Sequence, residues 1–216
     1  MIENVKERAV VSMQRRVFAA ALILSAVGLL ASTTFASNTT VNITATVSTT
    51  VTCNSSTGTL PFGTLSAGSV NVTNPTNVST TMACNDGAGC TESLNDLGNT
   101  STPGLWNASS TYLIQSPKSG STSTTSTISA GVEGYGIVAT TTAAGGGGTL
   151  SMNQRYNFTT GSGIIGSLTT SSLTLASSTS AITTAREVLS YPEAAISGTT
   201  LGGSYLDTLT YSCTGN

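Results

Sequence analysis

The predicted fold follows from the stretch Gly203-Ser-Tyr-Leu-Asp-Thr-Leu-Thr-Tyr-Ser-Cys213. Tyr205, Leu209, Tyr211 and Cys213 stand at positions of one parity, and Thr or Ser fills the positions between Leu209 and Cys213. Apolar and aromatic residues at a spacing of two are typical of a half-buried β-strand. We therefore predict a strand that ends in a cysteine.

A second stretch near the other end has the same character. The segment Val41-Asn-Ile-Thr-Ala-Thr-Val-Ser-Thr-Thr-Val-Thr-Cys53 also ends in a cysteine, and one of its faces carries Val41, Ile43, Ala45, Val47, Val51 and Cys53. This alternation predicts the first strand of the domain. One use for it is pairing inside its own domain, parallel to the strand that ends at Cys213.

Short strand-like segments separated by turn residues fill the chain between these two stretches. We expect strands at residues 70–72, 78–84, 90–97, 112–114, 132–138, 164–175, 188–191 and 194–196, and Tyr156 alternates with Phe158 in a further segment. Many short strands with Gly, Pro and Asn turns favour an all-β, immunoglobulin-like antiparallel β-sandwich. We assign residues 37–216 to this single domain.

Residues 1–36 have the features of a signal peptide. Lys6, Arg8, Arg15 and Arg16 precede a short apolar run at residues 17–30, and Thr34 and Ala36, on either side of Phe35, give small residues at the positions that a signal peptidase reads. We expect a signal helix that contacts a membrane only during export, and a protein that is secreted or held at the cell surface. An uncleaved N-terminal anchor is the alternative, although the apolar run is short for a membrane span.

The composition excludes a nucleic-acid partner. Only 7% of the residues are charged, compared with about 25% in typical globular proteins. Beyond residue 36 the basic residues are Lys118, Arg155 and Arg186. A basic footprint, which nucleic-acid binding requires, is therefore missing from the sequence.

The four cysteines predict two disulfides in an exported protein. Cys84 and Cys90 flank Asn-Asp-Gly-Ala-Gly, a strong turn signal, so a bridge across one hairpin would leave Cys53 to pair with Cys213. The other pairing considered is Cys53–Cys84 with Cys90–Cys213. A zinc site is disfavoured because the chain has no histidine.

The same lack of histidine excludes Ser-His-Asp and Cys-His catalysis. A carboxylate pair could hydrolyse glycosides, but no acid stands in a motif that indicates a raised pKa. We expect no enzymatic activity, no catalytic residue and no cofactor. Asp207 lies on the apolar face of the last predicted strand, where solvent or turn amides are expected to satisfy its carboxylate.

Two features point instead to a binding module. Asp86, Glu92 and Asp96 form the densest group of acidic residues and are a weak calcium candidate, although their spacing does not match a known calcium loop. A hairpin turn with solvated acids is the simpler interpretation. Trp106 and Tyr112 are candidates for contact with a surface glycan, although a lone tryptophan more often belongs to a core.

Several motifs resemble those of archaic chaperone–usher pilins and the related spore coat protein U domain. They are the Thr/Val-rich strand Val41–Cys53, the element Leu60-Pro-Phe-Gly-Thr64, the strand Val78–Cys84 and the ending Gly202-Gly-Ser-Tyr-Leu-Asp-Thr208. Their order agrees with that family over about a third of the expected mature chain, whereas residues 90–197 match poorly. The chain is also similar to uncharacterised Ser/Thr-rich secreted bacterial proteins.

The resemblance implies an incomplete sandwich completed by strand addition between subunits. The inserted residues would be Val41, Ile43, Ala45 and Val47, and the implied disulfide pairing is Cys53–Cys84 with Cys90–Cys213. The partners would be copies of this chain or other surface subunits. We expect a non-enzymatic structural or adhesive cell-surface protein, with a monomeric glycan- or calcium-binding module as the alternative.

Overall fold

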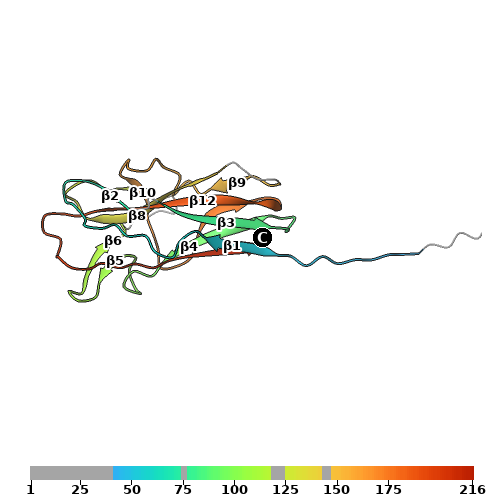
Figure 1. The fold of residues 1–216 in the computed structure, drawn as a ribbon, viewed down its shortest axis with the longest axis horizontal. Coiled ribbons are helices and arrows are strands. Elements are labelled where there is room, and N and C mark those ends of the chain that lie inside the picture. Colours follow the sequence, from blue (N-terminus) through green and yellow to red (C-terminus); the bar gives the residue numbers. More distant parts are fainter. Residues whose placement is uncertain (1–40, 74–76, 118–124, 143–146) are drawn as a thin grey trace, which may run out of the picture. The chain divides into compact units, whose positions relative to one another are not determined.

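The computed structural model describes residues 41–216 except 74–76, 118–124 and 143–146 (Figure 1). The predicted signal peptide, residues 1–36, lies outside the described residues. The chain divides into two compact units, Met1–Thr46 and Val47–Asn216. All regular structure in the described part of the chain is β-strand and belongs to the second unit. The described residues contain no helix that is long and apolar enough to cross a membrane.

The larger sheet is antiparallel and contains the long strand β12 (Ile182–Ala195) near its centre. Its strand order is β1 (Val51–Ser55), β3 (Val78–Cys84), β12, β8 (Gly134–Thr141), β10 (Ile164–Gly166) and β7 (Thr125–Thr127). The short strand β2 (Asn71–Val72) also pairs with β12. This order makes β1 an edge strand, with β3 as its neighbour.

A smaller antiparallel sheet contains the last strand of the chain. Its order is β13 (Leu209–Gly215), β4 (Cys90–Asp96), β11 (Leu173–Ser178) and β9 (Leu150–Met152). A separate hairpin is formed by β5 (Gly104–Asn107) and β6 (Tyr112–Gln115), and Leu206 pairs with Trp106 of β5. The residues just before β13 therefore join the hairpin to the end of the smaller sheet.

One hydrophobic core receives side chains from both sheets. In β3 and β4 every second residue is buried, as the alternating sequence predicts. Met82 of β3, Leu94 of β4, Ile137 of β8 and Leu175 of β11 are almost fully buried in this shared core. The all-β class and the antiparallel pairing predicted from the sequence are therefore confirmed.

The prediction of a strand over Val41–Cys53 is wrong in its extent and in its partner. Residues 41–50 contain no regular structure, and the strand begins at Val51. It pairs antiparallel with β3 and not with the C-terminal strand. Alternation alone favours a strand, but a strand forms only where a neighbour supplies hydrogen bonds.

Three further predictions are corrected. Residues 164–175 form two strands, β10 and β11, that belong to different sheets. Tyr156 and Phe158 lie outside any strand, although Tyr156 is buried. Conversely, the segments predicted at 188–191 and 194–196 are parts of one strand, β12, which ends at Ala195.

Pro192 lies within β12 at a place where the strand changes neighbours. On one side β12 pairs with β3 up to Ser190 and with β2 from Glu193 onward. On the other side it pairs with β8 throughout this region. A proline has no N–H to donate, and here it falls between the two pairings, so the long strand continues through it.

Candidate functional site

The segment with the strand-exchange candidates is exposed. Val41, Ile43 and Val47 are 75%, 91% and 83% exposed, and Ala45 is also exposed. Apolar side chains of this size are normally covered in a folded domain. Within the described residues this alternating face has no strand partner.

The Asn85 side chain fixes the residues that lead into β1. Its Oδ1 accepts from the Thr50 N–H at 2.7 Å, and its Nδ2 donates to the Ser48 carbonyl at 3.0 Å. The Asn85 N–H also donates to the Thr50 carbonyl at 3.2 Å. These hydrogen bonds hold the backbone from Ser48 to Thr50, which directly follows Val47, against Asn85.

The structure pairs Cys53 with Cys213 and Cys84 with Cys90. The first bond joins the edge strands β1 and β13 of the two sheets, with their Cα atoms 5.7 Å apart. The second closes the turn between β3 and β4. This is the hairpin pairing, and it differs from the pairing that the pilin resemblance implies. Two disulfides fit an oxidising compartment.

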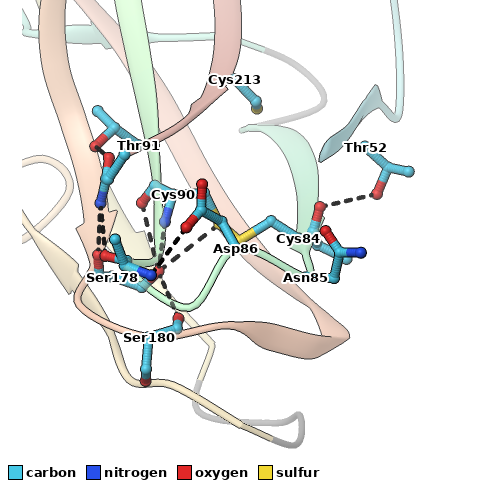
Figure 2. Close-up of a disulfide and its surroundings, with 12 residues drawn as sticks. Thr52, Cys84, Asn85, Asp86, Cys90, Thr91, Ser178, Ser180 and Cys213 are labelled. Atoms are coloured by element: carbon cyan, nitrogen blue, oxygen red, sulfur yellow. Dashed lines mark hydrogen bonds between the residues drawn. A yellow bond between two sulfur atoms is a disulfide. The ribbon is translucent and has the colours of Figure 1, made fainter. Parts of the chain in front are cut away.

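The Cys84–Cys90 bond is buried beside the end of β11 (Figure 2). The Cys90 N–H donates to Ser178 Oγ at 3.0 Å, and the Asn216 side-chain amide donates to the Ser178 carbonyl at 2.9 Å. Within the turn, Asp86 Oδ1 accepts from the Ala88 N–H at 2.9 Å. This region is therefore a closely hydrogen-bonded turn, and Asp86 takes part in it as a turn acceptor.

Glu92 lies inside the core, because it occupies an inward position of β4. It is 0% exposed, and its Oε1 accepts from the Thr80 hydroxyl at 2.5 Å. Its Oε2 has no hydrogen-bond partner among the described residues. Burial raises the pKa of the Glu92 carboxyl to about 7, although the Thr80 hydrogen bond acts in the opposite direction.

Asp96, four residues further along β4, is also 0% exposed. Its Oδ1 accepts from the Gly104 N–H at 3.3 Å. Burial raises the pKa of Asp96 to about 8, and the neighbouring Asp207 carboxyl contributes to this increase through its charge and a hydrogen bond. A carboxyl with this pKa carries a proton at neutral pH.

Asp207 is surrounded by donors. Its Oδ1 accepts from the N–H groups of Gly98, at 3.0 Å, and Thr208, at 2.7 Å. Its Oδ2 accepts from the Tyr135 hydroxyl at 3.0 Å. Turn amides thus satisfy this carboxylate near the strand end, as expected, together with a tyrosine that the sequence did not indicate.

A third buried acid, Glu193, lies on β12. It is 0% exposed, and its Oε1 accepts from the Gly161 N–H at 2.6 Å. Burial raises its pKa. These interior carboxyls were missed by sequence reasoning, although Glu92 and Asp96 share the parity of the buried Cys90 and Leu94 and could have been recognised from it.

The calcium candidates are not arranged as one oxygen-ligand site. Asp86 lies in the turn, whereas Glu92 binds Thr80 and Asp96 faces Asp207. In the described part of the chain no group of three or more His, Cys, Asp or Glu side chains could hold a metal ion.

Trp106 lies on the outward face of the β5–β6 hairpin. Leu206 stands opposite it on one side and Leu113 on the other, whereas the alternate positions Leu105 and Ile114 are buried. Trp106 and Leu113 are half-buried, and Leu206 is 73% exposed. Cross-strand neighbours project on the same side of a sheet, so these three side chains form an outward apolar ladder.

Tyr112 belongs to the other face of the hairpin. Its hydroxyl donates to Glu133 Oε1 at 2.6 Å, and its ring meets the Tyr205 ring edge-on with the centroids 6.5 Å apart. Tyr112 and Trp106 therefore do not form one aromatic surface.

Comparisons with known proteins identify no relative of the chain: no protein-family model, no curated protein and no solved structure matches it.

Proposed function

We propose that this chain is an exported, non-enzymatic structural or adhesive cell-surface protein with a pilin-like β-sandwich, and that its copies associate by strand addition. The observation that carries the proposal is the exposed, alternating apolar face of Val41, Ile43, Ala45 and Val47, which has no strand partner among the described residues. Such a segment buries its apolar side chains when it joins the sheet of another molecule.

A free sheet edge in the same molecule supports this use. Among the described strands β13 pairs only with β4, and β1 only with β3. An open edge offers backbone N–H and C=O groups to an incoming strand. The Cys53–Cys213 bond joins these two edge strands, so we propose that the incoming segment adds outside β1 or β13 and not between them.

The two disulfides support export, because such bonds persist in oxidising compartments. The low content of charged residues supports a role at a surface in place of catalysis. The chain has no histidine, and all four cysteines are in disulfides. Nucleophile–base pairs of the Ser–His and Cys–His type are therefore excluded.

The test compares two triple variants of the oxidised protein that begins at residue 37. Val41→Asp/Ile43→Asp/Val47→Asp places charges on the apolar face, and Asn42→Asp/Thr44→Asp/Thr46→Asp places the same number on the other face. We expect oligomers or fibres from the unmodified protein and the control, and monomers from the apolar-face variant, by light scattering and electron microscopy. A monomeric unmodified protein, or an assembling apolar-face variant, would contradict the proposal.

A second candidate function, glycan binding by a monomer, is favoured by the outward apolar ladder of Leu206, Trp106 and Leu113. A flat aromatic face at a protein surface suits stacking against a sugar ring. Titration of Trp106 fluorescence with surface polysaccharides tests this candidate. A saturable change that is lost in Leu206→Asp supports it, and an unchanged spectrum removes it.

A further inference from the structure

We infer that a protonated Asp96 donates a hydrogen bond to the Asp207 carboxylate and that this contact is a pH-sensitive clasp between the two sheets, which is closed in acidic and neutral solution and opens in alkaline solution. The inference is independent of the proposed function. It concerns the end of the domain where the chain enters its last strand.

The two carboxyls connect separate parts of the fold. Asp96 ends β4 in the smaller sheet, and Tyr135, which donates to Asp207, lies on β8 in the larger sheet. Asp207 itself precedes β13 and accepts from Gly98, in the loop that follows β4. The pair thus joins both sheets and the loop at residues 98–104.

Hydrogen-bond geometry calls for a proton on Asp96. If both groups were ionised, Asp96 Oδ2 would be a buried acceptor without a donor among the described residues, beside a second negative charge. A proton on Oδ2 turns this atom into a donor toward Asp207. Two carboxyls in contact commonly hold one proton between them. The raised pKa of Asp96, about 8, agrees with this arrangement.

A bound cation fits the same atoms less well. The Asp207 oxygens already accept from Gly98, Thr208 and Tyr135, and the other Asp96 oxygen accepts from Gly104. A cation requires several oxygen lone pairs directed at one point, whereas here four donors occupy them.

The titratable groups that face the pair are tyrosines. The pKa of Tyr135 is raised by burial and by the charges of Asp207, Asp96 and Tyr211. The pKa of Tyr211, on β13, is raised by burial above all and also by the charges of Glu92 and Asp207. Neither tyrosine ionises near neutral pH, so the proton lost on alkalinisation belongs to Asp96.

Two glycines make the surrounding loop possible. Gly98 has φ 49°, and a Cβ there would lie 2.0 Å from the Thr102 carbonyl oxygen. Gly104 has φ 144°, and its Cβ would lie 2.4 Å from the Ile114 carbonyl oxygen. The Gly98 N–H donates to Asp207 and the Gly104 N–H donates to Asp96. The loop at residues 98–104 can therefore reach the two carboxyls only because both of these positions are glycine.

Trp106 is a built-in reporter of this clasp. Its backbone N–H donates to the Leu206 carbonyl at 2.8 Å, and the Leu206 backbone N–H donates to the Trp106 carbonyl at 2.9 Å. Leu206 adjoins Asp207, and Trp106 is the single tryptophan of the chain. Release of Asp207 changes the surroundings of this indole.

The test is a titration of Trp106 emission in the full, oxidised protein. Between about pH 6 and about pH 9 we expect a transition with a midpoint near pH 8, where Asp96 loses its proton. Glu92, whose pKa is about 7, titrates in the same range, so the contribution of Asp96 is measured in Glu92→Gln, with and without Asp96→Asn. In this background Asp96→Asn places an amide donor opposite Asp207 and should abolish the transition while keeping the acid-form spectrum. Glu92→Gln, on the same strand, is the matched control and should retain it.

A second measurement avoids dependence on the variants. Amide exchange of the unmodified protein, corrected for intrinsic exchange, should show the protection factor of Gly98 falling by up to tenfold for each pH unit as the pH rises toward about 8, and levelling off above that pH. The inference is overturned if Trp106 emission is flat, if Asp96→Asn in the Glu92→Gln background retains the transition, or if Gly98 protection is constant. Restoration of the acid-form spectrum at pH 9 by calcium would replace the Asp96 proton with a cation site and would also overturn it.

Discussion

Cys53 and Cys213, which are 160 positions apart in the sequence, join the edge strand of one sheet to the edge strand of the other. Residues between them form nearly the whole described fold, including the second disulfide. The bond therefore constrains the unfolded chain far more than the Cys84–Cys90 bond, whose cysteines are 6 positions apart.

Removal of this long-range bond should lower the free energy of unfolding strongly. For Cys53→Ala/Cys213→Ala we expect a loss of about 5 kcal/mol in the loop-entropy description, compared with about 2 kcal/mol from the loop term of Cys84–Cys90. Urea denaturation monitored by circular dichroism measures the difference. A loss below about 1 kcal/mol for the Cys53/Cys213 variant would show that the bond adds little to a fold already closed by packing.

The two bonds should also differ in their accessibility to a reductant. Cys53 is exposed and Cys213 half-buried, whereas Cys84 and Cys90 are 4% and 0% exposed. Thiol–disulfide exchange requires access of the attacking thiolate to a sulfur atom. Mild reduction followed by alkylation and peptide mass spectrometry should label Cys53 and Cys213 first. Equal labelling of all four cysteines would mean that reduction proceeds through global unfolding.

Glu92 should make the protein more stable in acid than at neutral pH. Its pKa in the folded state, about 7, exceeds the ordinary value of 4.5. The contribution of protonated Glu92 to the free energy of unfolding is therefore complete below about pH 4.5 and is lost as the pH rises through about 7. Glu92→Gln should remove about 2 kcal/mol of the difference in unfolding free energy between pH 5 and pH 8.

Denaturant titrations at these two pH values test this expectation, and Asp86→Asn in the neighbouring turn is the control. If Glu92→Gln and Asp86→Asn change the pH dependence equally, Glu92 is not the group responsible.

Gly89 and Gly87, in the turn closed by Cys84–Cys90, offer a matched pair. Gly89 has φ 94°, and a Cβ there would lie 2.2 Å from the Ser178 carbonyl oxygen, whereas a Cβ at Gly87 meets nothing within 4 Å. Gly89→Ala should cost at least about 2 kcal/mol, and Gly87→Ala less than about 0.5 kcal/mol. Thermal unfolding of both variants gives the comparison, and equal melting temperatures would contradict the close approach to Ser178.

The sequence predicted strands best where alternation coincides with a neighbouring strand. Val78–Cys84 and Cys90–Asp96 are examples, since each has partners along its length. The same alternation predicted a strand wrongly at Val41–Val47. The spacing of apolar side chains does not reveal whether another strand is present to form backbone hydrogen bonds. The full length of β12 was also not predicted, since a proline such as Pro192 ordinarily argues against a central strand. The strand tolerates Pro192 because its neighbour changes there from β3 to β2, and the sequence does not show which strands are neighbours.

The buried carboxyls show a second limit of sequence reasoning. Because Glu92 and Asp96 follow the Asn-Asp-Gly turn, the sequence favours an interpretation of both as turn acids or calcium ligands. Their inward parity on β4 indicated burial, but their partners Thr80 and Asp207 come from distant parts of the chain. Long-range register, which local patterns do not contain, determines these contacts.

The Cys53–Cys213 bond also sets an order of events during biosynthesis. The chain is made from its N-terminus, so Cys84 and Cys90 emerge soon after Cys53, whereas Cys213 follows Cys53 by 160 residues. The Cys53 thiol therefore stays unpaired until Cys213 is made, and during that time it can form a wrong disulfide with Cys84 or Cys90. If the Cys84–Cys90 turn closes first, both competitors are removed, so the correct pairing of Cys53 with Cys213 depends on prior oxidation of this small loop.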